Sequence, residues 1–368
     1  MYHEVKVRYA KRIVTKKICI ITCYKDPDYV RARTLRAALQ ADSRLEVIVI
    51  KNRHKSALRY PEVITKILKV RLTKNPDTYL LTFRGYELLP FFYFLTLGKK
   101  RIFDEFINLI EWTVYEHKKV KEKTLAARLL WVVYRFFLKR NKLILADTQV
   151  HAEYSANLMK LPIAKFRAVP VGTDEGVFMP LDLHPDPKEF RVFYYGNMLP
   201  LHGLQYVIDA AVALKTNPRI SFLFIGGGNE AEGMIMDAQS KGANIEYKKW
   251  VPFADLPRFA AESNVCLGGP FGNTLQARMV ITGKTYQFLA MGVPTLVGEV
   301  DEKTPFEDGG NCLLVDQANP AAIAAKVEWA YNHKKELAEI GKNGRKAYNA
   351  YYSSKVLNQE LAEILKSI

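Results

Sequence analysis

The chain has 368 residues, of which 49% are hydrophobic and 25% charged, a globular composition that excludes a disordered or fibrous protein and has room for two or three domains. The formal net charge of +16 is confined to the first half. Residues 1–175 hold 35 Lys and Arg against 17 Asp and Glu, whereas residues 176–368 hold 19 against 21. This asymmetry indicates an anionic partner for the first half.

Several classes of protein are excluded by short sequence features. The basic N-terminal stretch, residues 1–17, is followed by an apolar run too short for a signal peptide. The longest apolar run, residues 88–98, falls short of the ~20 residues that a membrane-spanning helix needs. Without disulfide-scaffold or zinc-ligand spacing, we expect reduced, structural thiols in a cytoplasmic protein at Cys19, Cys23, Cys266 and Cys312.

Strands and helices alternate along the first half. Short β-branched runs predict buried parallel strands at 16–23, 45–50, 77–83, 100–106, 142–148 and 166–172. Helical spacing of apolar residues predicts helices at 26–42, 61–72, 87–97 and 123–139.

A proline-rich stretch, residues 173–190, interrupts this alternation and is typical of a linker. Strands are then expected at 190–196, 220–228, 245–251, 265–269 and 293–298, with helices at 203–214, 230–240, 255–262, 284–291 and beyond 320. The pattern predicts an α/β fold with two Rossmann-like, doubly wound domains facing a cleft. Because ligands bind beyond the carboxyl ends of parallel strands, this cleft is the expected active site.

The richest motif lies at residues 268–298. Gly268, Gly269 and Gly272 let backbone approach a ligand closely, and Lys284 begins the following helix. A helix N-terminus and a lysine together suit an anion such as a diphosphate. The pattern is equally compatible with a tight turn and a solvated lysine.

Two further glycine segments precede this motif. The cluster at 225–230 lacks the spacing and the downstream acidic residue of a dinucleotide site, which disfavours a nicotinamide oxidoreductase. In the segment 194–211, Asn197 and His202 lie in a loop and can hydrogen-bond phosphate oxygens. By position alone, His202 is more simply explained as a residue packed at a helix start.

In this order and spacing, the three segments resemble the C-terminal half of family 4 glycosyltransferases, which have the GT-B fold. The match extends through 248–268 and 307–315, and more weakly through 82–90, 101–106, 146–154 and 169–178. The resemblance implies retaining transfer of a sugar from a nucleotide-diphosphate sugar, UDP- or GDP-linked, to a hydroxyl acceptor, with no metal and no tightly bound cofactor. It also implies an acceptor domain at 1–172, the linker at 173–190, a donor domain at 191–350, and a C-terminal helix, 351–368, packing back on the acceptor domain.

The sequence departs from the family at two motifs. The loop cations of the family are replaced by Asn197 and His202, and its Glu-x7-Glu motif by Met279 and Gln287. These changes resemble a subgroup with a PLHG loop and a KxxQ pattern. Gln287 still offers an amide oxygen to the nucleotide ribose, without the assistance of charge. A degenerate, inactive transferase remains an alternative.

The resemblance implies a set of site residues. Lys284, Arg278 and His202 would stabilise the leaving diphosphate, as an oxyanion hole does, and Lys284, His151 and Asp104 are the expected catalytic residues. For Asp104, a helix N-cap is the competing interpretation. The expected donor-binding residues are Gly196, Asn197, His202, Gly203, Gly227, Trp250, Val251, Phe271, Gly272, Asn273, Thr274, Arg278, Lys284, Thr285 and Gln287.

Cations and apolar residues mix in the first half. The segments 63–74 and 125–142 read as amphipathic helices with basic edges, which suit an anionic membrane surface. We therefore expect a lipid-linked acceptor, a peripheral position on the inner face of the cell membrane, and a role in cell-envelope glycan or glycolipid synthesis. The competing interpretation is an ordinary core with solvated cations.

Two other functions stay open on the sequence. One is a nucleotide-sugar epimerase or hydrolase of the same fold. The other is a non-catalytic nucleic-acid-binding protein, although the chain lacks recognised nucleic-acid motifs and we expect no nucleic acid as a partner.

Overall fold

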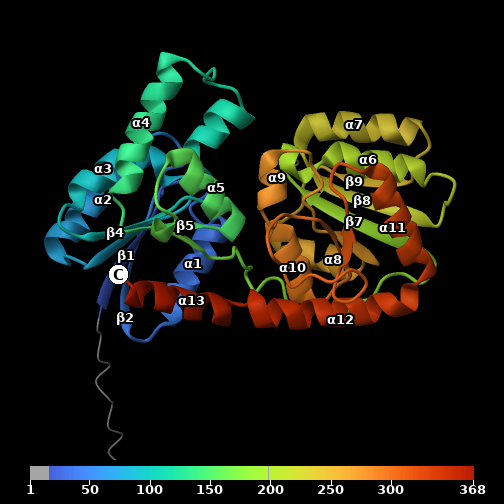
Figure 1. Ribbon diagram of the computed structural model, residues 1–368. Helices are drawn as coiled ribbons and strands as arrows, with labels where there is room; N and C mark the ends of the chain where they lie inside the picture. The colour runs from blue at the N-terminus through green and yellow to red at the C-terminus, as the bar shows by residue number, and fades with distance from the viewer. Residues whose placement is uncertain (1–15, 198) are drawn as a thin grey trace, which may run out of the picture.

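The computed structural model describes residues 16–197 and 199–368, so most of the basic N-terminal stretch lies outside the described residues. Two domains are each built on a six-stranded parallel sheet covered by helices (Figure 1). The expected α/β architecture with two doubly wound domains is therefore confirmed.

The sheet of the first domain has the order β2-β1-β3-β4-β5-β6. All its pairings are parallel, with Ile18 opposite both Val47 and Thr78. The strands are buried apolar runs, as expected of a sheet covered on both faces. They are β1 (Lys16–Thr22), β2 (Leu45–Lys51), β3 (Thr78–Leu81), β4 (Lys100–Asp104), β5 (Leu143–Ala146) and β6 (Phe166–Ala168).

The helices of this domain include three elements that the sequence did not predict, α5, the π-helix η2 and the short η3. The small buried residues Ala152, Ser155 and Ala156 give α5 little apolar periodicity. The helical elements are α1 (Val30–Ala41), α2 (Arg59–Thr73), η1 (Gly85–Leu88), α3 (Leu89–Leu95), η2 (Glu111–Glu116), α4 (Leu125–Lys139), α5 (Gln149–Met159) and η3 (Ile163–Lys165).

The second sheet has the order β12-β11-β10-β7-β8-β9. Its strands are β7 (Phe190–Gly196), β8 (Ile220–Gly226), β9 (Ile245–Lys248), β10 (Val265–Leu267), β11 (Thr295–Gly298) and β12 (Leu313–Val315). Its helical elements are η4 (Pro200–His202), α6 (Leu204–Ala213), α7 (Gly228–Ser240), η5 (Phe253–Asp255), α8 (Leu256–Ala261), α9 (Leu275–Met279), α10 (Gly283–Met291), α11 (Pro320–Asn332) and α12 (Lys334–Tyr351). The short elements α9 and β12 were not predicted.

The last helix, α13 (Ser354–Lys366), returns to the first domain. Figure 1 shows α12 running along the second domain and α13 continuing beneath the first, both in red. Leu357, Leu361 and Ile364 of α13 are buried in one apolar cluster with Ile18 and Leu35. The chain therefore crosses between the domains at two places, the linker and the start of α13.

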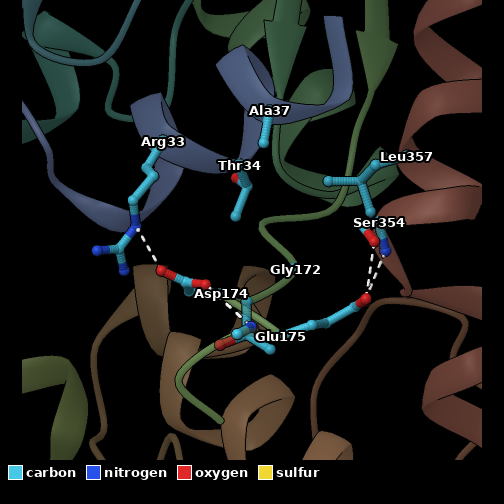
Figure 2. Close-up of a pocket in the computed structure, with 10 residues that line it drawn as sticks. Arg33, Thr34, Ala37, Gly172, Asp174, Glu175, Ser354 and Leu357 are labelled. Atoms are coloured by element: carbon cyan, nitrogen blue, oxygen red, sulfur yellow. Dashed lines mark hydrogen bonds and ion pairs between the residues drawn. The ribbon is translucent and has the colours of Figure 1, made fainter. Parts of the chain in front are cut away.

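A pocket marks the junction of these two crossings. Figure 2 shows it between α1, the linker and the first turn of α13. Glu175 of the linker accepts hydrogen bonds from the backbone N–H and the hydroxyl of Ser354, each at 2.7 Å. Arg33 of α1 pairs with Asp174 at 3.3 Å. A carboxylate at the start of α13 stabilises that helix end and fixes the linker beside it.

Two further expectations can be compared with the structure. All four cysteines are buried and unbridged. In the described ranges, no helix combines the length and the hydrophobicity that crossing a bilayer requires.

Candidate functional site

Lys284 is a buried cation in the first turn of α10, which begins after the N-cap Thr282. Its ammonium lies over the ring of Tyr194, 4.4 Å from the centroid, and has no hydrogen-bond partner among the described residues. Burial lowers the pKa of Lys284 to about 7. A desolvated ammonium without a carboxylate is unfavourable, and a bound anion would relieve it.

His202 lies next to this cation at the end of η4. Its Nδ1 is buried and, within the described chain, unpartnered. Burial, and then the charge of Lys284, hold the pKa of His202 well below its ordinary value. The ring is therefore neutral and can donate one hydrogen bond. Lys284 and His202 together offer two unsatisfied polar atoms in one electrostatically coupled site.

Glycines bring the surrounding loops into contact. A Cβ added to Gly203 would lie 2.4 Å from the carbonyl carbon of Phe271, and one added to Gly272 would lie 2.3 Å from the oxygen of Pro200. A Cβ on Gly196 would lie 3.6 Å from the Lys284 ammonium. The glycine loops singled out in the sequence, those after β7 and β10, therefore converge on this lysine.

Other expected donor-binding residues have mainly structural contacts. The Phe271 side chain is part of the core of the second domain. The hydroxyl of Thr274 caps α9 by accepting from the N–H of Ala277 at 3.1 Å, and that of Thr285 donates to the Gly269 carbonyl at 3.1 Å. These side chains shape the loop, and the backbone beside them remains the part expected to meet a ligand.

Five further donor-binding candidates lie around the second domain. Gly227 adopts a left-handed conformation, φ +88°, just before α7. Asn197 and Asn273 are exposed, and Trp250 is 75% exposed, followed by the half-buried Val251. A core position for Trp250 is therefore excluded.

Two expected ligand contacts differ in the structure. The guanidinium of Arg278 is ion-paired with Asp301 and its side chain is 56% exposed, so the pairing holds Arg278 at the surface. The amide oxygen of Gln287 already accepts a hydrogen bond from the Tyr195 hydroxyl. The sequence did not indicate these competing partners because Asp301 and Tyr195 lie far away along the chain.

Asp104 has a structural partner instead of an open position at the crevice. It ends β4, so it is not a helix N-cap, and it pairs with Arg31 at 2.8 Å with both side chains fully buried. Arg31 also donates to the carbonyl of Pro170 at 2.9 Å. The pair therefore ties α1 and β4 to the segment that leads into the linker, and the catalytic role expected of Asp104 stays a prediction.

His151 is also enclosed. It lies in the first turn of α5, fully buried, with Nδ1 2.7 Å from Asp147 and Nε2 3.8 Å from Glu111. Burial would lower the pKa of His151, but the carboxylates of Asp147, Glu111 and Glu105 outweigh it and raise the pKa to about 9. A buried imidazolium is not a general base at neutral pH, so this geometry favours a positioning role.

The helix that carries His151 contacts the second domain directly. The hydroxyl of Thr148, the N-cap of α5, donates to the carbonyl of Met279 at 2.6 Å. The backbone N–H of Val150 donates to Glu302 at 2.9 Å. The N-terminus of α5 thus holds the two domains together at the end of α9.

Aromatic residues that sequence reasoning missed also line this junction. Tyr29 stacks on Phe83 of the first domain, with ring centroids 4.7 Å apart. Tyr195 belongs to the second domain, across the junction from Tyr29. Its pKa is raised by burial and, to a smaller extent, by Tyr29. The sequence carried one signal for these residues, the Tyr-Tyr pair directly before Gly196.

Comparisons with known proteins agree with this architecture. Residues 189–333 match the family described as Glycosyl transferases group 1. Solved structures of Anabaena Alr3699/HepE in complex with UDP superpose with a TM-score of 0.72 at 13% identity, over 96% of this chain and 100% of that one. No curated protein sequence is significantly similar to the chain.

Two further solved structures are similar over nearly the whole length. Sucrose-phosphate synthase (tll1590) from Thermosynechococcus elongatus has a TM-score of 0.75 at 14% identity, covering 96% of this chain and 98% of that one. A glycosyltransferase from Rickettsia africae ESF-5 has a TM-score of 0.68 at 12% identity, covering 95% and 97%. The chain thus has the GT-B fold, and the match to the group 1 glycosyltransferase family covers residues 189–333 of its second domain.

Proposed function

We propose that this protein transfers a sugar, with retention, from a nucleotide-diphosphate sugar to a hydroxyl acceptor, and that Lys284 and His202 bind the diphosphate. The observation that carries the proposal is the buried Lys284 ammonium, which has no hydrogen-bond partner in the described residues and faces glycine loops at the start of a helix. A diphosphate would supply the missing negative charge and acceptor oxygens.

The donor is proposed to be a UDP-sugar. HepE, which shares the fold, was solved with UDP and with UDP-glucose. The exposed Trp250 and the backbone of Val251, next to β9, are proposed to line the base, with Gly227 near them. The loop from Phe271 to Thr274 would hold the sugar hydroxyls.

The chemistry follows from where charge develops. As the glycosidic bond breaks, the diphosphate gains negative charge, which Lys284, neutral His202 and the N-terminal N–H groups of α10 would stabilise. The acceptor hydroxyl passes its proton to the departing phosphate, so no buried side chain has to serve as base. His151 and Asp104 are proposed to hold the acceptor domain in position.

We further propose a cytoplasmic protein that works at an anionic membrane on a lipid-linked acceptor, in cell-envelope synthesis. The helix α4 projects from the first domain (Figure 1) and exposes apolar side chains between cations. Its most exposed apolar residues are Leu125 (81%), Leu129 (61%) and Val132 (49%). Such a face suits the boundary between lipid headgroups and acyl chains.

The decisive experiment is a thermal-shift screen with UDP, GDP, ADP and their sugars. Ligand binding stabilises the folded state by mass action, so UDP should raise the Tm and Lys284→Ala should abolish that rise. Lys241→Ala, which removes an exposed lysine of the same domain, is the matched control. Absence of a shift with every nucleotide would refute the proposal.

A second readout uses the protonation of Lys284. Since its pKa is about 7 in the free protein and an anion would raise it, UDP binding at pH 8 should take up protons. Calorimetry in buffers of different ionisation enthalpy measures that uptake, which should disappear in Lys284→Ala.

A further inference from the structure

Arg84 occupies an unusual position at the carboxyl end of β3. It is a half-buried residue with left-handed backbone, φ +52°, a conformation that costs energy for a residue with a side chain and that clusters at functional sites. Its guanidinium donates to the Tyr86 hydroxyl at 2.7 Å. It also lies 5.6 Å from the ring centroid of Tyr24. Aromatic groups therefore hold the cation in place.

A second cation lies on the same aromatic platform. The Trp112 ring of η2 has the Arg84 guanidinium 4.8 Å from its centroid and the Lys119 ammonium 4.0 Å from it. Neither cation forms an ion pair within 4.0 Å in residues 16–197 and 199–368. Two cations drawn to the same ring repel each other, and a bound anion would offset that repulsion.

One carboxyl group, that of Glu87, interacts with Arg84. Burial raises the pKa of Glu87 by more than the positive charges of Arg84 and Arg59 lower it. A bound anion would supply Arg84 and Lys119 with the close negative charge that no carboxylate provides within 4.0 Å in the described part of the chain.

The position of this cluster places it beside the donor cleft. Phe83, the residue before Arg84, stacks on Tyr29, and Tyr29 lies close enough to Tyr195 of the second domain to contribute, after burial, to its raised pKa. Arg84 therefore lies on the acceptor side of the junction whose other side holds Lys284.

We propose that Arg84 and Lys119, arranged around Trp112, bind a phosphoryl group carried by the acceptor. This deepens the proposed function and rests on it, because only a transferase has an acceptor. Arginine presents a planar fork of N–H donors that matches phosphate oxygens, and the aromatic platform fixes that fork in advance. The substrate class is then a phosphorylated or diphosphate-linked hydroxyl compound.

The test uses inorganic pyrophosphate as the probe, on the full chain saturated with UDP so that the Lys284 site is filled. Tryptophan fluorescence should report a second, saturable binding event, and Trp112→Phe should remove most of that signal. Arg84→Gln should weaken pyrophosphate binding at least tenfold while leaving the UDP Kd within twofold. Lys119 is exposed, so Lys119→Gln should leave the fold intact and should also weaken pyrophosphate binding.

The matched control is Arg71→Gln. Arg71 lies in the last turn of α2, where its guanidinium donates to the carbonyl of Leu97 at 3.2 Å. Arg71→Gln should change neither the affinity for pyrophosphate nor the affinity for UDP. Equal pyrophosphate binding by the wild type, Arg84→Gln and Lys119→Gln would overturn the proposal. So would a loss confined to binding of phosphatidylglycerol vesicles, because it would assign Arg84 to the membrane surface.

The two proposals fail differently. If UDP does not bind, the transferase proposal fails, and pyrophosphate binding is then measured in Lys284→Ala to keep the donor site out of the result. If UDP binds and pyrophosphate shows no second event, the acceptor site alone is refuted.

Discussion

The Lys284 ammonium lies 4.4 Å from the centre of the Tyr194 ring, buried between glycine loops, in place of the carboxylate that usually accompanies a buried lysine. The Tyr194 hydroxyl points elsewhere, to the carbonyl of His202 at 2.9 Å. The face of an aromatic ring attracts a cation but replaces only part of its hydration. In the free protein, the Lys284 ammonium therefore lacks full compensation for its lost hydration. This lowers the stability of the fold and favours binding of an anion.

Lys284→Met should stabilise the free protein. The substitution removes a buried charge and keeps the volume, so the free energy of unfolding at pH 6 should rise by about 1–3 kcal/mol. Denaturant unfolding of the second domain measures it. The gain should shrink as pH rises above 7, where the wild-type lysine loses its proton. UDP should no longer stabilise the variant, and a less stable variant that still binds UDP would contradict the assignment.

His151→Gln should reveal a pH dependence of the opposite sign. The folded pKa of about 9 lies above the ordinary 6.5, so this group stabilises the protein fully below pH 6.5 and loses that effect as pH rises through 9. The stability advantage of the wild type over the variant should fall by about 1–3 kcal/mol between pH 6 and pH 9.5. Urea midpoints at several pH values measure it. Lys284 is present in both proteins, so its contribution cancels, and a constant difference would argue against a charged His151.

Asp104→Asn should act on stability. The change leaves the fully buried Arg31 without its counter-charge, which typically costs about 3–5 kcal/mol. Thermal or urea unfolding of the first domain measures the loss. The exposed pair gives a control, since Asp301→Asn should cost less than about 1 kcal/mol. If Asp104→Asn instead loses activity without losing stability, Asp104 takes part in the reaction itself.

Replacing Leu125 and Leu129 together by Gln should weaken membrane binding. Both side chains are mostly exposed on α4, so the fold should not change. Co-sedimentation with phosphatidylglycerol vesicles at low salt should show at least a tenfold loss of affinity, because apolar area no longer enters the interface. Met236→Gln, at a 62% exposed position of the second domain, is the control and should have no effect. If the double variant binds the vesicles as tightly as the wild type does, α4 is not the membrane-binding element.

The sequence by itself predicted most of the two sheets and the position of Lys284 at the start of a helix. Buried parallel strands are continuous apolar runs, so β1 and β2 are visible in local composition and lie within a residue of their predicted bounds. A glycine loop followed by a lysine at a helix start is likewise a local pattern, and it correctly indicated where Lys284 lies. The sequence thus predicted the features that depend on a few consecutive residues.

The tertiary structure decided which polar groups are already paired. Asp104 meets Arg31 across 73 residues, and Gln287 meets Tyr195 across 92. Neither partner is marked by spacing along the chain, because hydrogen bonds and ion pairs depend on distance in space. The helix α5 was missed for a related reason, since small residues pack well in a folded protein but give no apolar stripe in a sequence. Local periodicity therefore determined the elements and the position of Lys284. Long-range pairing determined that Asp104, Arg278 and Gln287 already have side-chain partners, whereas the Lys284 ammonium and His202 Nδ1 have none in the described part of the chain.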